Sequence, residues 1–153
     1  NLVIGLIGDL IGGYIHPELE QTNSMPPMRG ISFVKNLIIS GLKYLHDQLP
    51  EVNKITVIGI CGNHSRTTKK IQFSNGFEMN YEYFMYKDIE RTLTLMGLTK
   101  FSFIIPESEF AYIDVRKESF ICARASIPHG WRYRRYLPVN DALVRQNEPN
   151  NKY

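Results

Sequence analysis

Hydrophobic positions form two nearly continuous runs with a helical stripe between them. The runs are Val3–Ile7 and Lys54–Cys61. Runs rich in β-branched residues are typical of strands covered on both faces, as in parallel sheets. Between them, "PPMRG" can open a helix and Pro50 ends it. Its apolar residues recur every three or four positions, which predicts one buried face: Ile31, Val34, Ile38, Leu42, Leu45 and Leu49. The pattern therefore predicts a right-handed βαβ unit.

The second half of the chain predicts another helix and three short strands. The helix runs from about Asn80 to Met96, and Gly97 provides its C-terminal cap. The strands are "FSFIIP", "FAYIDV" and "SFICA", and the turn "RKE" joins the last two as a hairpin. A short helix is expected over Val139–Gln146. We therefore expect one α/β domain over residues 1–147, with a mainly parallel core followed by a β-hairpin, and a polar tail over 148–153.

Composition places the chain among soluble globular proteins. Hydrophobic residues make up 43% and charged residues 22%. No apolar run approaches the ~20 residues that cross a bilayer, so we expect no membrane partner. The two cysteines, Cys61 and Cys122, lie in apolar strand-like runs and do not form a disulfide framework. This usage indicates a reducing, cytoplasmic compartment.

Positive charge is concentrated in two segments, although the net charge is only +3. Residues 64–72 carry Arg66, Lys69 and Lys70 without an acid. Residues 124–135 also lack acids and carry four arginines: Arg124, Arg132, Arg134 and Arg135. Such clusters can attract phosphate. The alternative is that each is an ordinary solvated loop face.

Polar groups follow both predicted parallel strands. The first run is followed by Gly8-Asp9, and the second by Gly62-Asn63-His64. Parallel strands end at the same sheet edge, where α/β proteins bind ligands, so these residues are expected to meet. A carboxylate, an amide and an imidazole together suit divalent metals such as Mn, Zn or Fe. Taken singly, Asp9 could cap a turn and His64 could be a hydrogen-bonded loop residue.

The combination of "GDLIGG" and "GNHSR" resembles the second and third motifs of the calcineurin-like metallophosphoesterases. "GDLIGGYIHPELEQTN" followed by "GNHSRTTKK" is similar to a subgroup found in phages. The resemblance covers roughly residues 2–135, the middle part of the family domain. It implies a partial calcineurin-like α/β sandwich, and a location in the cytoplasm of a phage-infected host.

The resemblance also implies a two-metal hydrolase with Mn, Zn, Fe or Mg as cofactor. Asp9 would bridge both ions, Asn63 and His129 would ligate the second ion, and His64 would contact the scissile phosphate. A metal-bound hydroxide would attack the phosphorus. Arg66, Lys69 and Lys70 would then line the rim of the site, where the phosphate backbone of DNA or RNA would pass. His16, just after Asp9, is assigned to a surface or packing role, with metal ligation as the alternative.

Two family motifs have no counterpart in this sequence. Asp-x-His would precede residue 1, and Gly-His-x-His would follow residue 130. We therefore expect a fragment or trimmed product with little or no phosphodiesterase activity by itself. The rival interpretations are a degenerate, non-catalytic member, and an α/β nucleic-acid-binding module without metal that stacks bases on Trp131 and Tyr133.

Overall fold

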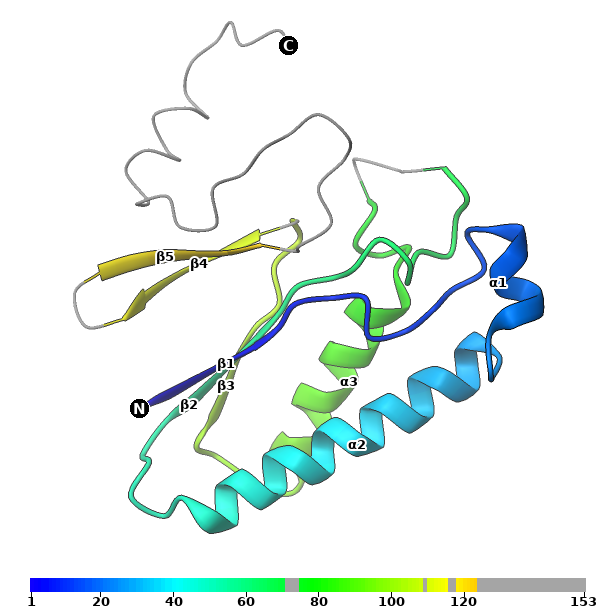
Figure 1. Ribbon diagram of the computed structural model, residues 1–153. Helices are drawn as coiled ribbons and strands as arrows, with labels where there is room; N and C mark the ends of the chain where they lie inside the picture. Colours follow the sequence, from blue (N-terminus) through cyan, green and yellow to red (C-terminus); the bar gives the residue numbers. More distant parts are fainter. Residues whose placement is uncertain (71–74, 109, 116–117, 124–153) are drawn as a thin grey trace, which may run out of the picture.

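The structure is a computed structural model, and it describes residues 1–70, 75–108, 110–115 and 118–123. The elements follow one another as shown in Figure 1. Their order is β1 (Leu2–Leu6), α1 (Pro17–Thr22), α2 (Pro27–Gln48), β2 (Ile55–Gly59), α3 (Tyr81–Leu95), β3 (Phe101–Ile104), β4 (Phe110–Val115) and β5 (Glu118–Ala123). The predicted α/β class and the predicted elements up to residue 123 are therefore confirmed. The helix expected over Val139–Gln146 and the tail over 148–153 lie outside the described residues.

The first three strands form a parallel sheet in the order β1-β2-β3. Leu2 pairs with Ile55 in β2, and Ile55 pairs with Phe101 in β3. The β1–α2–β2 segment is the expected βαβ unit. Strands β4 and β5 pair antiparallel as the predicted hairpin.

The two long helices cover one face of the sheet, and the hairpin covers part of the other (Figure 1). On the helical side, Ile31 and Leu42 of α2 and Ile89 of α3 join Ile55 and Val57 of β2 in one hydrophobic core. On the opposite side, Ile58 and Ile60 pack with Ala111 of the hairpin in a smaller cluster. The central strand β2 is therefore covered on both faces, as its apolar run predicts.

The expectation of two-sided burial is wrong for β1. Val3 and Gly5 are exposed, and Leu2, Ile4 and Leu6 are partly buried. Strand β1 lies at an edge of the three-stranded sheet, and the hairpin cluster involves β2 rather than β1. An apolar run alone cannot reveal which of two strands the hairpin covers.

Helix α3 begins and ends as its sequence predicts. The side chain of the N-cap residue Asn80 accepts a hydrogen bond from Glu82 N. At the other end, Gly97 has a φ of +73°, the left-handed conformation that closes many helices. The loop expected between β1 and α2 contains a feature that was not predicted, the short helix α1, which begins at Pro17.

Candidate functional site

The segments after β1 and β2 meet at the carboxyl edge of the sheet, as expected. The backbone N–H of His64 donates a hydrogen bond of 3.0 Å to Oδ1 of Asp9. The N–H of Gly13 donates one of 2.9 Å to the carbonyl of His64. Asn63 lies between Gly62 and His64 in this contact zone. Asp9, Asn63 and His64 are therefore brought together although more than fifty residues separate the two segments.

Two glycines make this close approach possible. A Cβ at Gly62 would overlap the backbone N and Oδ1 of Asp9, and a Cβ at Gly8 would lie 2.5 Å from Gly62 N. Gly8 has a φ of +75°, and Asp9 itself has a φ of +53°. Left-handed backbone is uncommon for residues other than glycine, but aspartate adopts it more readily than most. Glycine is therefore needed at positions 8 and 62, because a side chain at either position would clash with the other segment.

A buried glutamate behind the strand ends ties both segments to α3. One oxygen of Glu82 accepts from Leu10 N at 2.6 Å and Ile11 N at 3.3 Å, and the other accepts from Gly62 N at 2.6 Å. The residue is fully buried. The role of Glu82 was not predicted from the sequence. A glutamate in the first turn of a helix is usually an exposed side chain that the helix dipole stabilises.

Burial determines the protonation behaviour of Glu82. Loss of solvent raises the pKa of its carboxyl above the ordinary 4.5, although the hydrogen bonds from Gly62 and Leu10 oppose that shift. The nearby negative charge of Asp9 raises the pKa further. Two carboxylates with different surroundings therefore lie at this edge, Asp9 exposed and Glu82 buried.

The beginning of the basic segment is also held by the start of α3. Asn80 Nδ2 donates to the carbonyl of Gly62 at 2.9 Å, and the hydroxyl of Ser65 donates to Asn80 Oδ1 at 2.9 Å. The N–H of Tyr81 donates to the carbonyl of Ser65. Arg66 forms an isolated antiparallel bridge with Asn80. Gly62, Ser65 and Arg66 of "GNHSR" are therefore joined to the residues that begin α3.

His16 is exposed, and its ring lies near that of His64. Its ring centroid is 5.7 Å from that of His64, with the rings tilted by 57°. His16 is the N-cap residue of α1, so this short helix positions it against the loop that follows β2. His16 follows Asp9 by seven residues, and this short separation was the signal in the sequence that could have placed it at the site.

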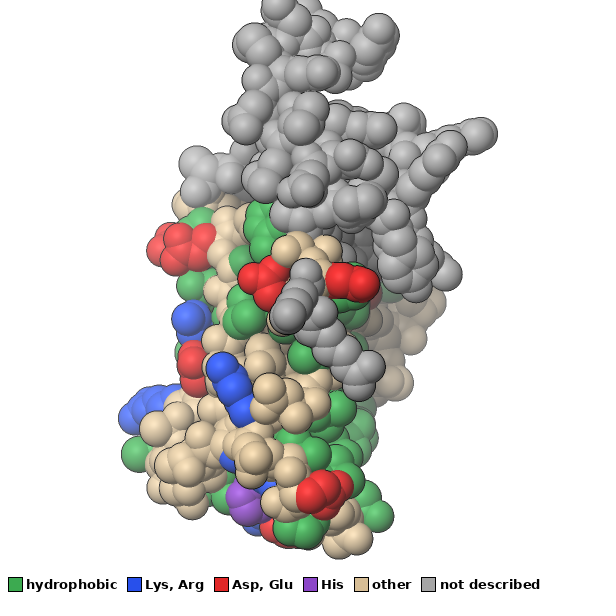
Figure 2. All heavy atoms as spheres, turned by 90° about the vertical axis from the view of Figure 1, so that its left-hand side faces the viewer, with side chains coloured by type: hydrophobic (Ala, Val, Ile, Leu, Met, Phe, Trp, Pro, Cys, Tyr) green, Lys and Arg blue, Asp and Glu red, His purple; other side chains and the backbone are tan. Residues whose placement is uncertain are grey.

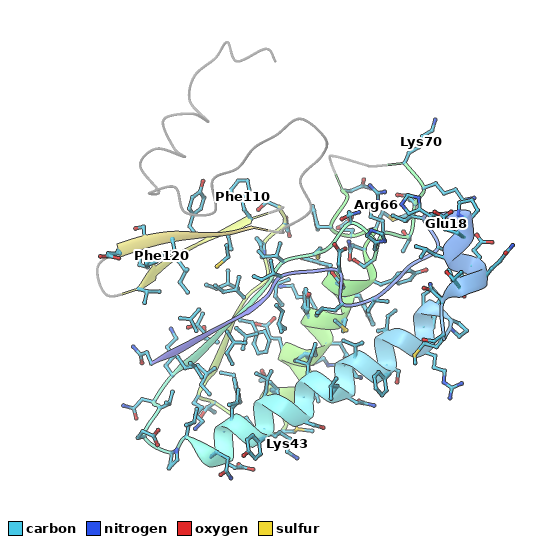
Figure 3. All side chains as sticks on the ribbon, in the orientation of Figure 1. Glu18, Lys43, Arg66, Lys70, Phe110 and Phe120 are labelled. Carbon is cyan, nitrogen blue, oxygen red and sulfur yellow. The ribbon has the colours of Figure 1, made fainter. Side chains whose placement is uncertain are left out.

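The rim formed by the basic segment is mixed in charge. Figure 3 shows Arg66 and Lys70 at the same end of the molecule as Glu18, and Lys70 extends outward. Glu18 and Glu20 both lie in the first turn of α1. The acid-free stretch of sequence therefore shares its end of the molecule with at least one acidic side chain, that of Glu18 (Figure 3).

A hollow beside Leu10 does not contain the predicted site residues. It has a volume of about 200 Å³ and lies between the segment after Asp9 and the start of α2, where its lining includes Leu10, Asn23, Met25 and Phe33. Asp9, Asn63 and His64 are not among its lining residues. Asp9 is exposed, and Asn63 and His64 are partly buried.

Part of the predicted site lies outside the described residues. His129, the second arginine cluster and the stacking residues Trp131 and Tyr133 all belong to that part of the chain. Within residues 1–123, excluding the gaps, no three His, Cys, Asp or Glu side chains gather in a way that could hold a metal ion. Within the same ranges, no helix has the length and apolar character needed to span a membrane.

Comparisons with known proteins add no assignment. No family model, curated protein or solved structure matches this chain.

Proposed function

We propose that this chain carries part of the active site of a metal-dependent phosphoesterase that hydrolyses a phosphodiester such as DNA or RNA. The observation that supports it is the contact between His64 N and Asp9 Oδ1. That contact joins a strand-Gly-Asp segment to a strand-Gly-Asn-His segment at the ligand-binding edge of a parallel sheet. We also propose that the fold is a partial calcineurin-like α/β sandwich.

The residues at this edge fit a divalent metal ion as part of its ligand set. The exposed carboxylate of Asp9 and the amide oxygen of Asn63 are hard donors of the kind that Mn²⁺ and Mg²⁺ accept. His129 is the proposed further ligand. A bound ion would supply hydroxide near neutral pH by lowering the pKa of water.

The remaining residues act on the substrate. The imidazole of His64 would donate a hydrogen bond to a phosphate oxygen and stabilise the charge that develops there. Arg66, Lys69 and Lys70 would contact neighbouring phosphates of an extended strand. Glu82 would hold the backbone of both segments, since its carboxylate accepts from Leu10, Ile11 and Gly62.

Manganese binding tests the proposal directly on the chain. We expect Mn²⁺ to bind the wild type, as measured by electron paramagnetic resonance, and Asp9→Asn to weaken that binding. Loss of an outer-shell partner already costs about 10–100-fold in metal affinity, so loss of a direct ligand should cost at least about 100-fold. Asp114→Asn, an exposed change in the hairpin, is the matched control.

Turnover of a chromogenic phosphodiester is measured on the same samples. His64→Gln should retain the metal while lowering any turnover, because His64 is assigned to the phosphate. Equal manganese binding by wild type and Asp9→Asn would contradict the proposal. Nucleic-acid binding without any metal binding would favour the metal-free α/β binding module instead.

A further inference from the structure

Helix α2 has a second apolar face that points away from the core. Its inner face buries Ile31, Ile39 and Leu42. On the outer side, Phe33 is 58%, Leu37 62% and Tyr44 65% exposed. At about 100° per residue, these three side chains lie within about 40° of one another around the helix axis. Apolar patches of this kind on a soluble protein mark interaction surfaces.

This outer stripe, Phe33, Leu37 and Tyr44, has a gap that a large side chain can fill. Gly41 lies one turn after Leu37, and a Cβ built there would have no heavy atom within 4 Å. Ser40, on the same side, is exposed as well. Small residues at a helix surface allow another helix to approach to about 8 Å. The stripe therefore combines large apolar side chains with a notch that could receive one of them.

Opposite charges flank the stripe at its two ends. Arg29 precedes it and Asp47 follows it, and both side chains are exposed. By the same helical arithmetic they lie about 40° from Phe33, on one side of the stripe. The carboxylate of Asp47 is 68% exposed, although it also contacts His46. Arg29 thus lies at one end of the surface and Asp47 at the other, with the exposed Lys43 one turn before Asp47.

We propose that two copies of this chain form a dimer through this face, with their α2 helices antiparallel about a two-fold axis. Three pairs of positions share the same midpoint in residue number, at residues 38–39. They are Phe33 with Tyr44, Leu37 with Gly41, and Arg29 with Asp47. One axis there would bring each residue against the other member of its pair in the partner subunit. Each Leu37 would enter the notch at Gly41, and each Arg29 would face Asp47.

A second copy fits this surface better than an unrelated partner. An isologous interface must be complementary to itself, with each contact occurring twice. The shared midpoint of an apolar pair, a large–small pair and a charge pair meets that requirement. The opposed helix dipoles also favour the antiparallel arrangement. This inference does not depend on metal binding or on phosphoesterase activity.

The experiment is sedimentation equilibrium of the full 153-residue chain over a range of concentrations. We expect a reversible monomer–dimer equilibrium for the wild type. Leu37→Glu should weaken dimerisation by about tenfold or more, because it introduces a charge at the centre of the interface. Ser32→Glu, an exposed position on α2 away from the stripe, is the matched control and should dimerise like the wild type. Circular dichroism of each variant checks that the fold is retained.

Charge exchange tests the antiparallel geometry. Arg29→Asp alone and Asp47→Arg alone should each weaken dimerisation, since each places like charges together. A mixture of these two variants should form a heterodimer, and the double variant should dimerise again. A wild type that stays monomeric, or a dimer that Leu37→Glu leaves intact, would overturn the proposal. Single charge variants that dimerise like the wild type would overturn the antiparallel pairing.

Discussion

Glu82 shows how a single buried side chain can organise a site to which the sequence assigns other residues. Its two oxygens accept hydrogen bonds from three backbone N–H groups, which belong to the segments that follow β1 and β2. A carboxylate is suited to this position because it is acceptor-only when ionised. The cost is the loss of its hydration, which is why the fold shifts its protonation equilibrium.

This shift predicts how Glu82 affects stability with pH. Burial raises the carboxyl pKa above 4.5, so the folded state holds the proton more tightly than the unfolded state. The contribution of Glu82 to the free energy of unfolding therefore falls as pH rises from the unfolded pKa through the folded one. The slope from one group is at most about 1.4 kcal/mol per pH unit.

Urea unfolding between about pH 4 and pH 7 checks the prediction. Glu82→Gln cannot titrate, so wild-type stability should decline relative to that of the variant as pH rises. Glu51→Gln is the control for the same chemical change at an exposed position, and it should follow the wild-type profile. A constant difference between the wild type and Glu82→Gln across this range would show that burial does not perturb Glu82.

At the scale of elements, sequence periodicity predicted the helices and strands that meet at the site. The apolar stripe of α2, the cap residues of α3 and the run in β2 each carried a local signal that the packing preserves. The exposure of Val3 in β1 carried no such signal, because it depends on strand neighbours distant in sequence. The short helix α1 did carry a local signal that was overlooked, with Pro17 at its start and Glu18 and Glu20 in its first turn. The contact of Asp9 with His64 followed from strand order alone.

The close approach of the segments after β1 and β2 predicts a steric limit at Gly62. Gly62→Ala would place a methyl group on the backbone N and Oδ1 of Asp9. Because the obstacle includes backbone, the segment must shift, and we expect a loss of about 1–3 kcal/mol in the free energy of unfolding. Gly30→Ala is the control in α2, since its nearest neighbour would be at 3.6 Å.

Urea denaturation measures both glycine variants, and amide chemical shifts of Asp9 and His64 report the local displacement. Gly30→Ala should change stability by no more than about 1 kcal/mol, because alanine favours the helix and meets only ordinary contacts. Wild-type stability in Gly62→Ala, with unchanged shifts at Asp9, would contradict the steric argument.

At the scale of the whole molecule, charge distribution is the feature least predictable from sequence. Lys43 and Lys70 lie at opposite ends of the molecule (Figure 3). The face at the end away from the site carries Lys, Arg, Asp and Glu side chains interspersed with one another (Figure 2). Near the site, Glu18 of α1 lies at the same end of the molecule as Arg66 and Lys70 (Figure 3). The attraction of that segment for a polyanion therefore depends on which charged side chains lie near it in space, and a count of charges along the sequence does not show this.

The last prediction separates a nucleic-acid rim from a solvated loop. Lys69 and Lys70 are both exposed and lie in the segment that begins at the candidate site. Lys69→Ala combined with Lys70→Ala should weaken binding of single-stranded DNA and flatten its salt dependence. Each lost phosphate contact reduces the slope of log affinity against log salt by roughly 0.7. Fluorescence anisotropy across a salt series measures that slope.

The control pair, Lys43→Ala with Lys54→Ala, removes the same charge from exposed positions outside this segment. If the change reflects only net charge, both pairs will shift binding alike, and the lysines of the rim are ordinary solvated charges. A smaller slope for the first pair alone would mean that phosphates pass over this edge of the sheet.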